Sequence, residues 1–192
     1  MIRARLTNFY VVLAILAFQP AAAQDHGGAA IPGHSLGAPA PDASPYAGME
    51  KRGVKALSDQ QIADLKAGRG MGFALAAEVN GYPGPSHVLE FADVLQLSDK
   101  QRSRTTALLE AMKAETIPLG ERIIAAETSL DRLFAERRVT RASLDAAIST
   151  IGTTQGELRA AHLRYHLSMI EVLSTAQIAH YATLRGYGES RK

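Results

Sequence analysis

The chain has 192 residues, 46% hydrophobic and 21% charged, a composition that excludes a collagen-like or wholly disordered protein. It contains no Cys and no Trp, which excludes disulfides, Cys-based zinc sites, iron–sulfur clusters and thiol nucleophiles. The formal net charge of +2 is due to Arg3 and Arg5, because the remaining 19 basic residues balance 19 acidic ones. This balance, with only 6% aromatic residues, gives no indication of nucleic-acid binding.

The N-terminal segment has the pattern of a secretory signal peptide. Arg3 and Arg5 form a positive region, Phe9–Phe18 is apolar, and Ala21–Ala23 offers a small-residue cleavage site. The apolar run is shorter than the ~20 residues that span a bilayer. We therefore expect cleavage after Ala23 and a mature chain in the bacterial periplasm that does not span a membrane. An uncleaved, anchored form is the alternative.

The composition changes directly after this segment. From Gln24 to Pro45, Pro and Gly alternate with Ala and there is almost no charge, so little apolar surface could be buried. The sequence therefore predicts three parts: a signal peptide over 1–23, a flexible Pro/Gly/Ala-rich tether over 24–56, and one helical domain over 57–192.

A helix-start phrase, Leu-Ser-x-x-Gln, occurs three times in that domain, at 57–61, 97–101 and 173–177. The Ser is an N-cap that accepts a bond from the backbone three residues later, and the Gln returns one to the cap. A fourth start, at Thr140, has the flanking apolar pair, Val139 and Leu144, without a Gln. These phrases are explained by their role in starting helices, and no further function has to be assigned to them.

The helical pattern continues to the C-terminus in several segments. In chain order we predict a helix after Ser58, a hinge at 68–72, helical structure over 73–79, a turn at 80–85, and helices over 86–95, 98–136, 140–172 and 174–185. The connection at 137–139 is too short for anything except an antiparallel hairpin. Gly120 and Gly156 lie level in this hairpin and could let its two helices approach closely. The predicted fold is therefore all-α: an elongated antiparallel hairpin of long helices with short flanking helices.

Both long helices carry a second apolar stripe, roughly opposite the seam of the hairpin. A helix with two apolar faces needs a second partner, which could be the last helix, another copy of the chain or a bound client. We therefore expect a homodimer, and we assign client or partner contacts to these stripe residues: Leu163, Leu167, Ile170, Ile117 and Ile124.

A possible metal site lies on the second long helix. His162 and His166 are spaced i, i+4, with Met169 one turn further, so the three lie on roughly one face. Imidazoles at this spacing can chelate Zn, Ni, Co or Cu, and Glu115 and His87 are possible further ligands. The alternative is a packed core containing a bonded His and a buried Met, with no metal required.

The exported, Cys-free helical chain with two such boxes around a long hairpin resembles the Spy/CpxP superfamily, which includes the metal-responsive proteins ZraP and CnrX. The resemblance covers residues 86–185 and rests on the box residues Leu97, Ser98, Gln101, Leu173, Ser174 and Gln177. It implies a curved antiparallel homodimer in the periplasm that cradles unfolded clients without ATP or modulates an envelope-stress sensor.

The resemblance also implies a metal set for CnrX-like members: two His on an early helix, a Glu on the first hairpin arm, and a His and a Met before the second box. Met169 matches the Met, His166 lies one residue from the His, and His87 lies near the early pair, whose second member is missing. The balanced charge also departs from the basic concave face of Spy-like proteins.

Our first functional hypothesis is therefore an ATP-independent chaperone or envelope-stress adaptor that binds non-native or partner proteins through apolar helical surfaces. The second is a heavy-metal-binding sensor, and the third is a purely structural helical docking module. An enzyme is not expected, because the sequence shows no nucleophile elbow, paired-acid motif or phosphate loop.

Overall fold

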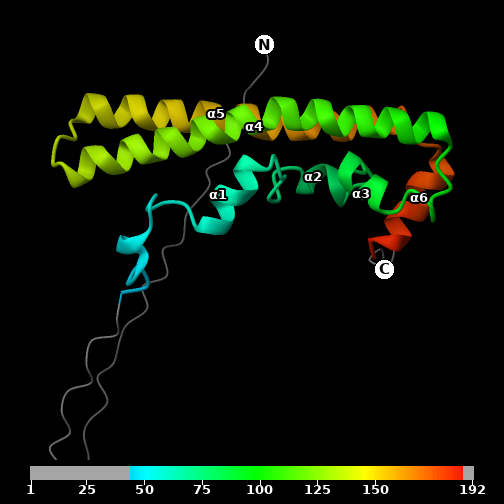
Figure 1. The fold of residues 1–192 in the computed structure, drawn as a ribbon, viewed down its shortest axis with the longest axis horizontal. Helices are drawn as coiled ribbons and strands as arrows, with labels where there is room; N and C mark the ends of the chain where they lie inside the picture. The colour runs from blue at the N-terminus through cyan, green and yellow to red at the C-terminus, as the bar shows by residue number, and fades with distance from the viewer. Residues whose placement is uncertain (1–43, 188–192) are drawn as a thin grey trace, which may run out of the picture. The chain divides into compact units, whose positions relative to one another are not determined.

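The computed structural model describes residues 44–187, so the expected signal peptide and most of the tether lie outside the described residues. The described chain is helical and contains no strand (Figure 1). Its elements are a short 3-10 helix, η1 (Met49–Lys51), followed by six α-helices: α1 (Asp59–Lys66), α2 (Leu75–Glu78), α3 (Pro85–Glu90), α4 (Asp99–Ala135), α5 (Arg141–Ile170) and α6 (Thr175–Leu184).

The predicted hairpin of long helices is confirmed. Helices α4 and α5 lie side by side, and the short helices α1, α2 and α3 follow one another along the hairpin (Figure 1). Helices α1 and α3 pack mainly on α4, whereas α2 contacts α5. A two-helix hairpin leaves much apolar surface exposed, and this row of short helices covers part of it.

The helix starts follow the predicted capping chemistry. Ser58, Ser98 and Ser174 each cap their helix, and the Gln at the third helical position completes a capping box in every case. At Thr140 the predicted start is also correct, but Ser143 completes the box in place of a Gln. Because these bonds satisfy backbone groups at the helix ends, local sequence determines where the helices begin.

The Gln residues of the boxes at Ser98 and Ser174, Gln101 and Gln177, also bond to each other. The Gln101 amide donates to the Gln177 side-chain oxygen at 2.8 Å and to the Val172 carbonyl at 2.9 Å. In return the Gln177 amide donates to the Leu95 carbonyl and the Gln101 side-chain oxygen, each at 3.2 Å. This reciprocal pair joins the start of α4 to the start of α6, a contact that no local sequence pattern predicts.

Apolar side chains gather in two clusters along the hairpin. One lies at the α6 end and contains Val88, Ala92, Leu95, Leu97, Met169, Val172, Leu173 and Tyr181. The other lies under α1 and contains Leu65, Ile123 and Leu158. Toward the α4–α5 loop the apolar seam opens, and Phe134 and Ile148 are 54% and 52% exposed.

The prediction for Gly120 and Gly156 is wrong. A Cβ on Gly120 would lie 2.5 Å from the carbonyl oxygen of Leu65, so this glycine admits α1 rather than α5. A Cβ on Gly156 would meet nothing within 4 Å. The two glycines are equally far from the hairpin loop in sequence. Close approach of α4 and α5 also requires both glycines to lie on the faces where the two helices meet, and distance from the loop does not determine that.

The predicted boundary between tether and helical domain falls within described residues. Val54 is buried, and Lys55 forms a 3.5 Å ion pair with Asp131 of α4. The last residues of the predicted tether therefore pack with the helical unit.

The reciprocal Gln pair leads to a test by substitution. In Gln101→Glu the side chain can still accept the capping bond from Ser98, but it loses the two bonds that its amide donates. We expect a loss of about 1–3 kcal/mol in the free energy of unfolding, measured by urea denaturation.

Gln61→Glu is the matched control, because Gln61 completes the same box and its side chain accepts a bond only from Ser58. Its effect should stay within about 0.5 kcal/mol. Equal effects of the two substitutions would show that the pair adds nothing beyond capping.

Candidate functional site

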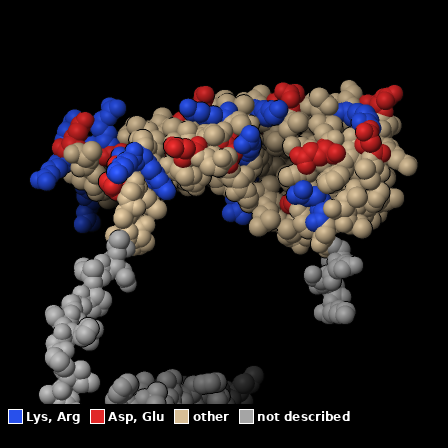
Figure 2. Space-filling model, turned by 60° about the horizontal axis from the view of Figure 1, so that its bottom comes forward, with Lys and Arg blue, Asp and Glu red and all other residues tan. Residues whose placement is uncertain are grey.

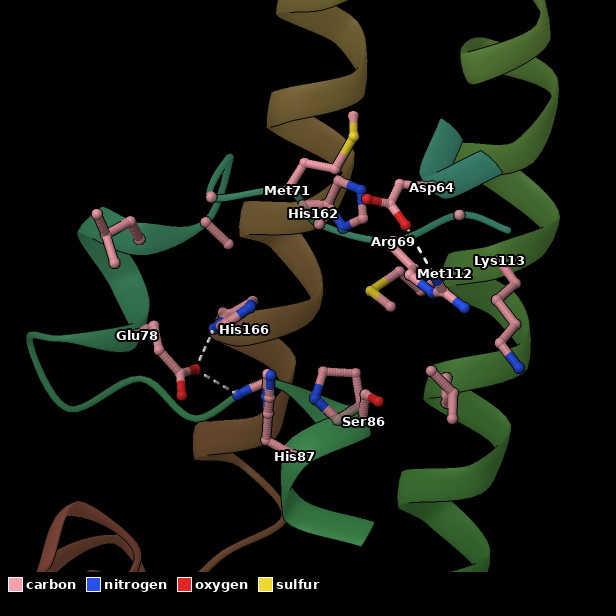
Figure 3. A pocket seen from close by; sticks show the side chains of 18 of the residues that line it. Asp64, Arg69, Met71, Glu78, Ser86, His87, Met112, Lys113, His162 and His166 are labelled. Atoms are coloured by element: carbon pink, nitrogen blue, oxygen red, sulfur yellow. Dashed lines mark hydrogen bonds and ion pairs between the residues drawn. The ribbon is translucent and has the colours of Figure 1, made fainter. Parts of the chain in front are cut away.

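A cavity of about 750 Å³ lies where α1, α2 and α3 face the hairpin, and we call it the His cavity. It falls between the two apolar clusters: along α5, for example, Leu158 belongs to one cluster, Met169 to the other, and His162 and His166 lie between. Its polar and sulfur-containing lining (Figure 3) includes Asp64, Arg69, Met71, Glu78, His87, Met112, Lys113, His162 and His166.

His162 is a buried, neutral imidazole. It is 2% exposed and stacks on Phe73 with ring centroids 6.3 Å apart, and its Nε2 is buried without a hydrogen-bond partner. Burial, and secondarily the neighbouring His166, lowers the pKa of His162 to about 4. At neutral pH the ring therefore keeps a nitrogen lone pair, which is the form that binds a metal ion.

His166 is oriented by the backbone. Its Nδ1 lies 2.7 Å from the carbonyl oxygen of Tyr82, and because a carbonyl only accepts, Nδ1 carries the proton. In the neutral ring the lone pair is then on Nε2, and Figure 3 shows the other ring nitrogen turned away from Glu78. A Cβ on Gly84 would lie 2.8 Å from Cε1 of His166, so the backbone packs directly against the ring. Imidazole ligands of metals are commonly held in this way by a bond from the second nitrogen.

Glu78 ties the lining of the cavity to the C-terminal helix. Glu78 is 8% exposed, and its carboxylate accepts hydrogen bonds from the Tyr181 hydroxyl, the Tyr187 hydroxyl at 3.3 Å and the Gly84 backbone N–H at 3.2 Å. The Arg185 guanidinium lies 3.5 Å away. Burial and the bond to Glu78 raise the pKa of Tyr181, which keeps its phenol protonated as a donor. The same carboxylate lies 3.7 Å from Nδ1 of His166.

The proposed metal ligands separate into two groups. His162, His166 and His87 line the one cavity, and Nδ1 of His87 is also buried without a partner. Met169 is instead fully buried in the apolar cluster at the α6 end. Glu115 forms an ion pair with Arg164 and lines a second pocket on the hairpin.

The expected client contacts also differ in their surroundings. Ile117 lies against the hinge, since a Cβ on Gly68 would be 3.2 Å from its Cγ1, and Ile124 packs on the cluster under α1. On α5, Leu167 is 58% exposed, and Leu163 and Ile170 are partly buried. The flanking helix of the same chain therefore serves as the second partner of α4.

Sequence reasoning missed three residues of the site. Met112 belongs to the apolar seam and indicated only core packing, and Met71 lies in a Gly-rich segment that indicated only a hinge. Glu78 lies at the end of a short helical pattern without a marker of function. No signal in the sequence marked it, because its neighbour Val79 is 47% exposed and only the tertiary fold buries Glu78.

Among residues 44–187, no three His, Asp or Glu side chains gather in a group able to hold a metal ion. The fold and the cavity thus define a helical hairpin protein in which two buried imidazoles and two thioethers line a cavity beside the short flanking helices.

The sequence matches the family model described as heavy-metal resistance over residues 71–179, more than half of the chain. The chain belongs to this family, which is part of the Spy/CpxP-like superfamily that includes ZraP- and CnrX-like proteins, so the resemblance is confirmed. Members of the family are typically periplasmic and non-enzymatic. Comparisons with curated proteins and with solved structures found no match. In the part of the chain that the structure describes, no helix has the length and hydropathy to cross a bilayer.

The lowered pKa of His162 predicts a pH dependence of stability. Unfolded His162 takes up a proton near its ordinary pKa of 6.5, whereas folded His162 does so only near 4. Its contribution to stability is therefore complete above pH 6.5 and is lost as the pH falls toward 4. In the presence of a chelator, the free energy of unfolding should decline over this interval, and His162→Phe should flatten the decline.

The same protein can be followed by NMR. The ring resonances of His162 should not titrate above about pH 5. A His162 midpoint near its ordinary value would contradict the buried, neutral state.

Proposed function

We propose that the protein is a periplasmic heavy-metal-binding protein of the Spy/CpxP superfamily, in which His162 and His166 hold the ion. The observation that carries this proposal is the buried Nε2 of His162, which has no hydrogen-bond partner, on a ring that lines the His cavity. An unsatisfied buried polar atom costs about 1–3 kcal/mol, so its retention favours a ligand that uses the lone pair. The family match supports the same class of ligand.

The arrangement around the cavity supports a sensing or sequestering role rather than catalysis. The two imidazoles belong to α5, whereas the opposite lining comes from α1, α2 and α3. An ion bound by both sides would stabilise their packing in proportion to its concentration. In such a protein, the signal of metal binding is a change in the stability of the flanking helices. We include in the proposal cleavage after Ala23, a periplasmic location and a homodimer.

Calorimetric titration of the mature chain with Ni, Co, Cu and Zn salts tests the proposal. His162→Phe keeps the stacking area beside Phe73 and removes the nitrogens, and His166→Gln removes the second lone pair. Each should weaken binding at least tenfold, a conservative value for loss of a ligand.

His180→Gln is the control, because His180 is exposed on α6. Circular dichroism should confirm that all three variants fold. Affinities that do not change in the two cavity variants would overturn the assignment of the site.

A second candidate function is binding of non-native proteins, as the sequence first suggested. The observation that favours it is an apolar stripe on and beside α2, where Leu75, Val79 and Tyr82 are 58%, 47% and 39% exposed. In Figure 2 basic side chains gather near the α4–α5 loop, and over the rest of the visible face both signs are interspersed. A client would therefore be held mainly by apolar contact.

Aggregation of a heat-unfolded client, followed by light scattering without nucleotide, tests this second function. Wild-type protein at a stoichiometric ratio should suppress aggregation, and the double variant Leu75→Ser, Val79→Ser should lose most of the effect. The variant Leu167→Ser changes the exposed α5 residue that the sequence predicted as a client contact. Its effect, set beside that of the double variant, shows which of the two surfaces binds the client. No suppression by wild type would exclude a chaperone role for that client class.

A further inference from the structure

Two thioethers also line the His cavity. They come from α4 and from the loop between α1 and α2, whereas the imidazoles of His162 and His166 belong to α5. Met112 projects from α4 and is 7% exposed, and Met71 lies on the loop between α1 and α2 and is 38% exposed. In Figure 3 the sulfur of Met112 points into the space beside His162 and His166. Met169, by contrast, is closed inside the apolar cluster at the α6 end.

We propose that the His cavity selects a soft monovalent ion, Cu(I) or Ag(I), with Met112 and Met71 as the residues that determine this selectivity. The inference rests on the proposed function and specifies its ligand. Thioethers are soft donors that favour Cu(I), and neutral imidazole also suits copper.

The charges around the cavity favour a single positive charge over two. Asp64 is paired with Arg69 at 2.7 Å, and Glu78 is engaged by Tyr181, Tyr187 and Arg185. Of the other charged lining residues, Lys113 is paired with Glu110 at 3.4 Å, and Glu90 is exposed, so the charges around the cavity are balanced. With neutral donors and no net negative charge around them, the energy of burying an ion rises steeply with its charge.

The backbone at Met71 gives independent support. Met71 has φ +42°, a left-handed conformation that a non-glycine residue rarely adopts, between Gly70 and Gly72. Glycine would take this conformation at a cost lower by about 1–2 kcal/mol. A long thioether side chain at this position therefore indicates a use for the side chain, and the loop places it on the cavity.

The test compares Ag(I), added as nitrate in chloride-free buffer, with Zn(II), using the folded mature chain. We expect wild-type protein to bind Ag(I) at least a hundredfold more tightly than Zn(II). Met112→Leu conserves volume and should weaken Ag(I) binding at least tenfold while leaving Zn(II) affinity unchanged, and Met71→Leu should act in the same direction. X-ray absorption at the silver edge should detect sulfur neighbours in wild type and fewer in Met112→Leu.

Met169→Leu is the matched control, because it makes the same substitution in the core and should leave Ag(I) affinity unchanged. If both cavity Met variants bind Ag(I) as wild type does while His162→Phe abolishes Zn(II) binding, the selectivity is wrong and the metal-binding function stands. If neither ion depends on His162, His166 or Met112, the selectivity and the proposed function both fail.

Discussion

The packing of three short helices along one side of a long hairpin is the constraint on which the rest of the structure depends. Helices α4 and α5 cannot bury their apolar residues by themselves, as the exposure of Phe134 and Ile148 near the loop illustrates. Where α1 covers the hairpin, Leu65, Ile123 and Leu158 form a core, and where α3 and α6 cover it, Val88 and Met169 do. The His cavity lies between these two cores, so the same packing that stabilises the fold also creates the candidate site.

Polar contacts then determine how the flanking helices are attached. The Gln101 and Gln177 side chains bond to each other across the starts of α4 and α6, and Glu78 bonds to Tyr181, Tyr187 and the backbone of Gly84. Buried hydrogen bonds of this kind are directional, so they specify one arrangement where apolar packing alone would allow several. The Glu78 carboxylate also lies beside His166, which places the cavity and α6 in one network.

The character of the site follows from its neutral donors. Burial keeps His162 uncharged, the Tyr82 carbonyl selects the proton position on His166, and Met71 and Met112 carry no charge. Because Asp64 and Glu78 are already paired, these two carboxylates contribute little negative charge to a bound ion. These features are what a heavy-metal-binding member of the family would need in order to discriminate between ions by softness and charge.

Local sequence alone determined where the four capped helices, α1, α4, α5 and α6, begin. The boxes at Ser58, Ser98 and Ser174 operate within a few residues, and the short connection after α4 requires an antiparallel return, so both could be predicted. The His pair was predictable for the same reason, since i, i+4 spacing places both rings on one helical face.

Only the tertiary structure decided what surrounds that pair. Met112 and Met71 line the cavity while Met169 does not, and Glu115 turns to Arg164, because these outcomes depend on the faces by which separate helices meet. Gly120 is a further example, because the helix that packs against it is α1 rather than the predicted α5. Helical periodicity specifies which residues share a face, whereas the partner of each face is determined by long-range packing that no local pattern contains.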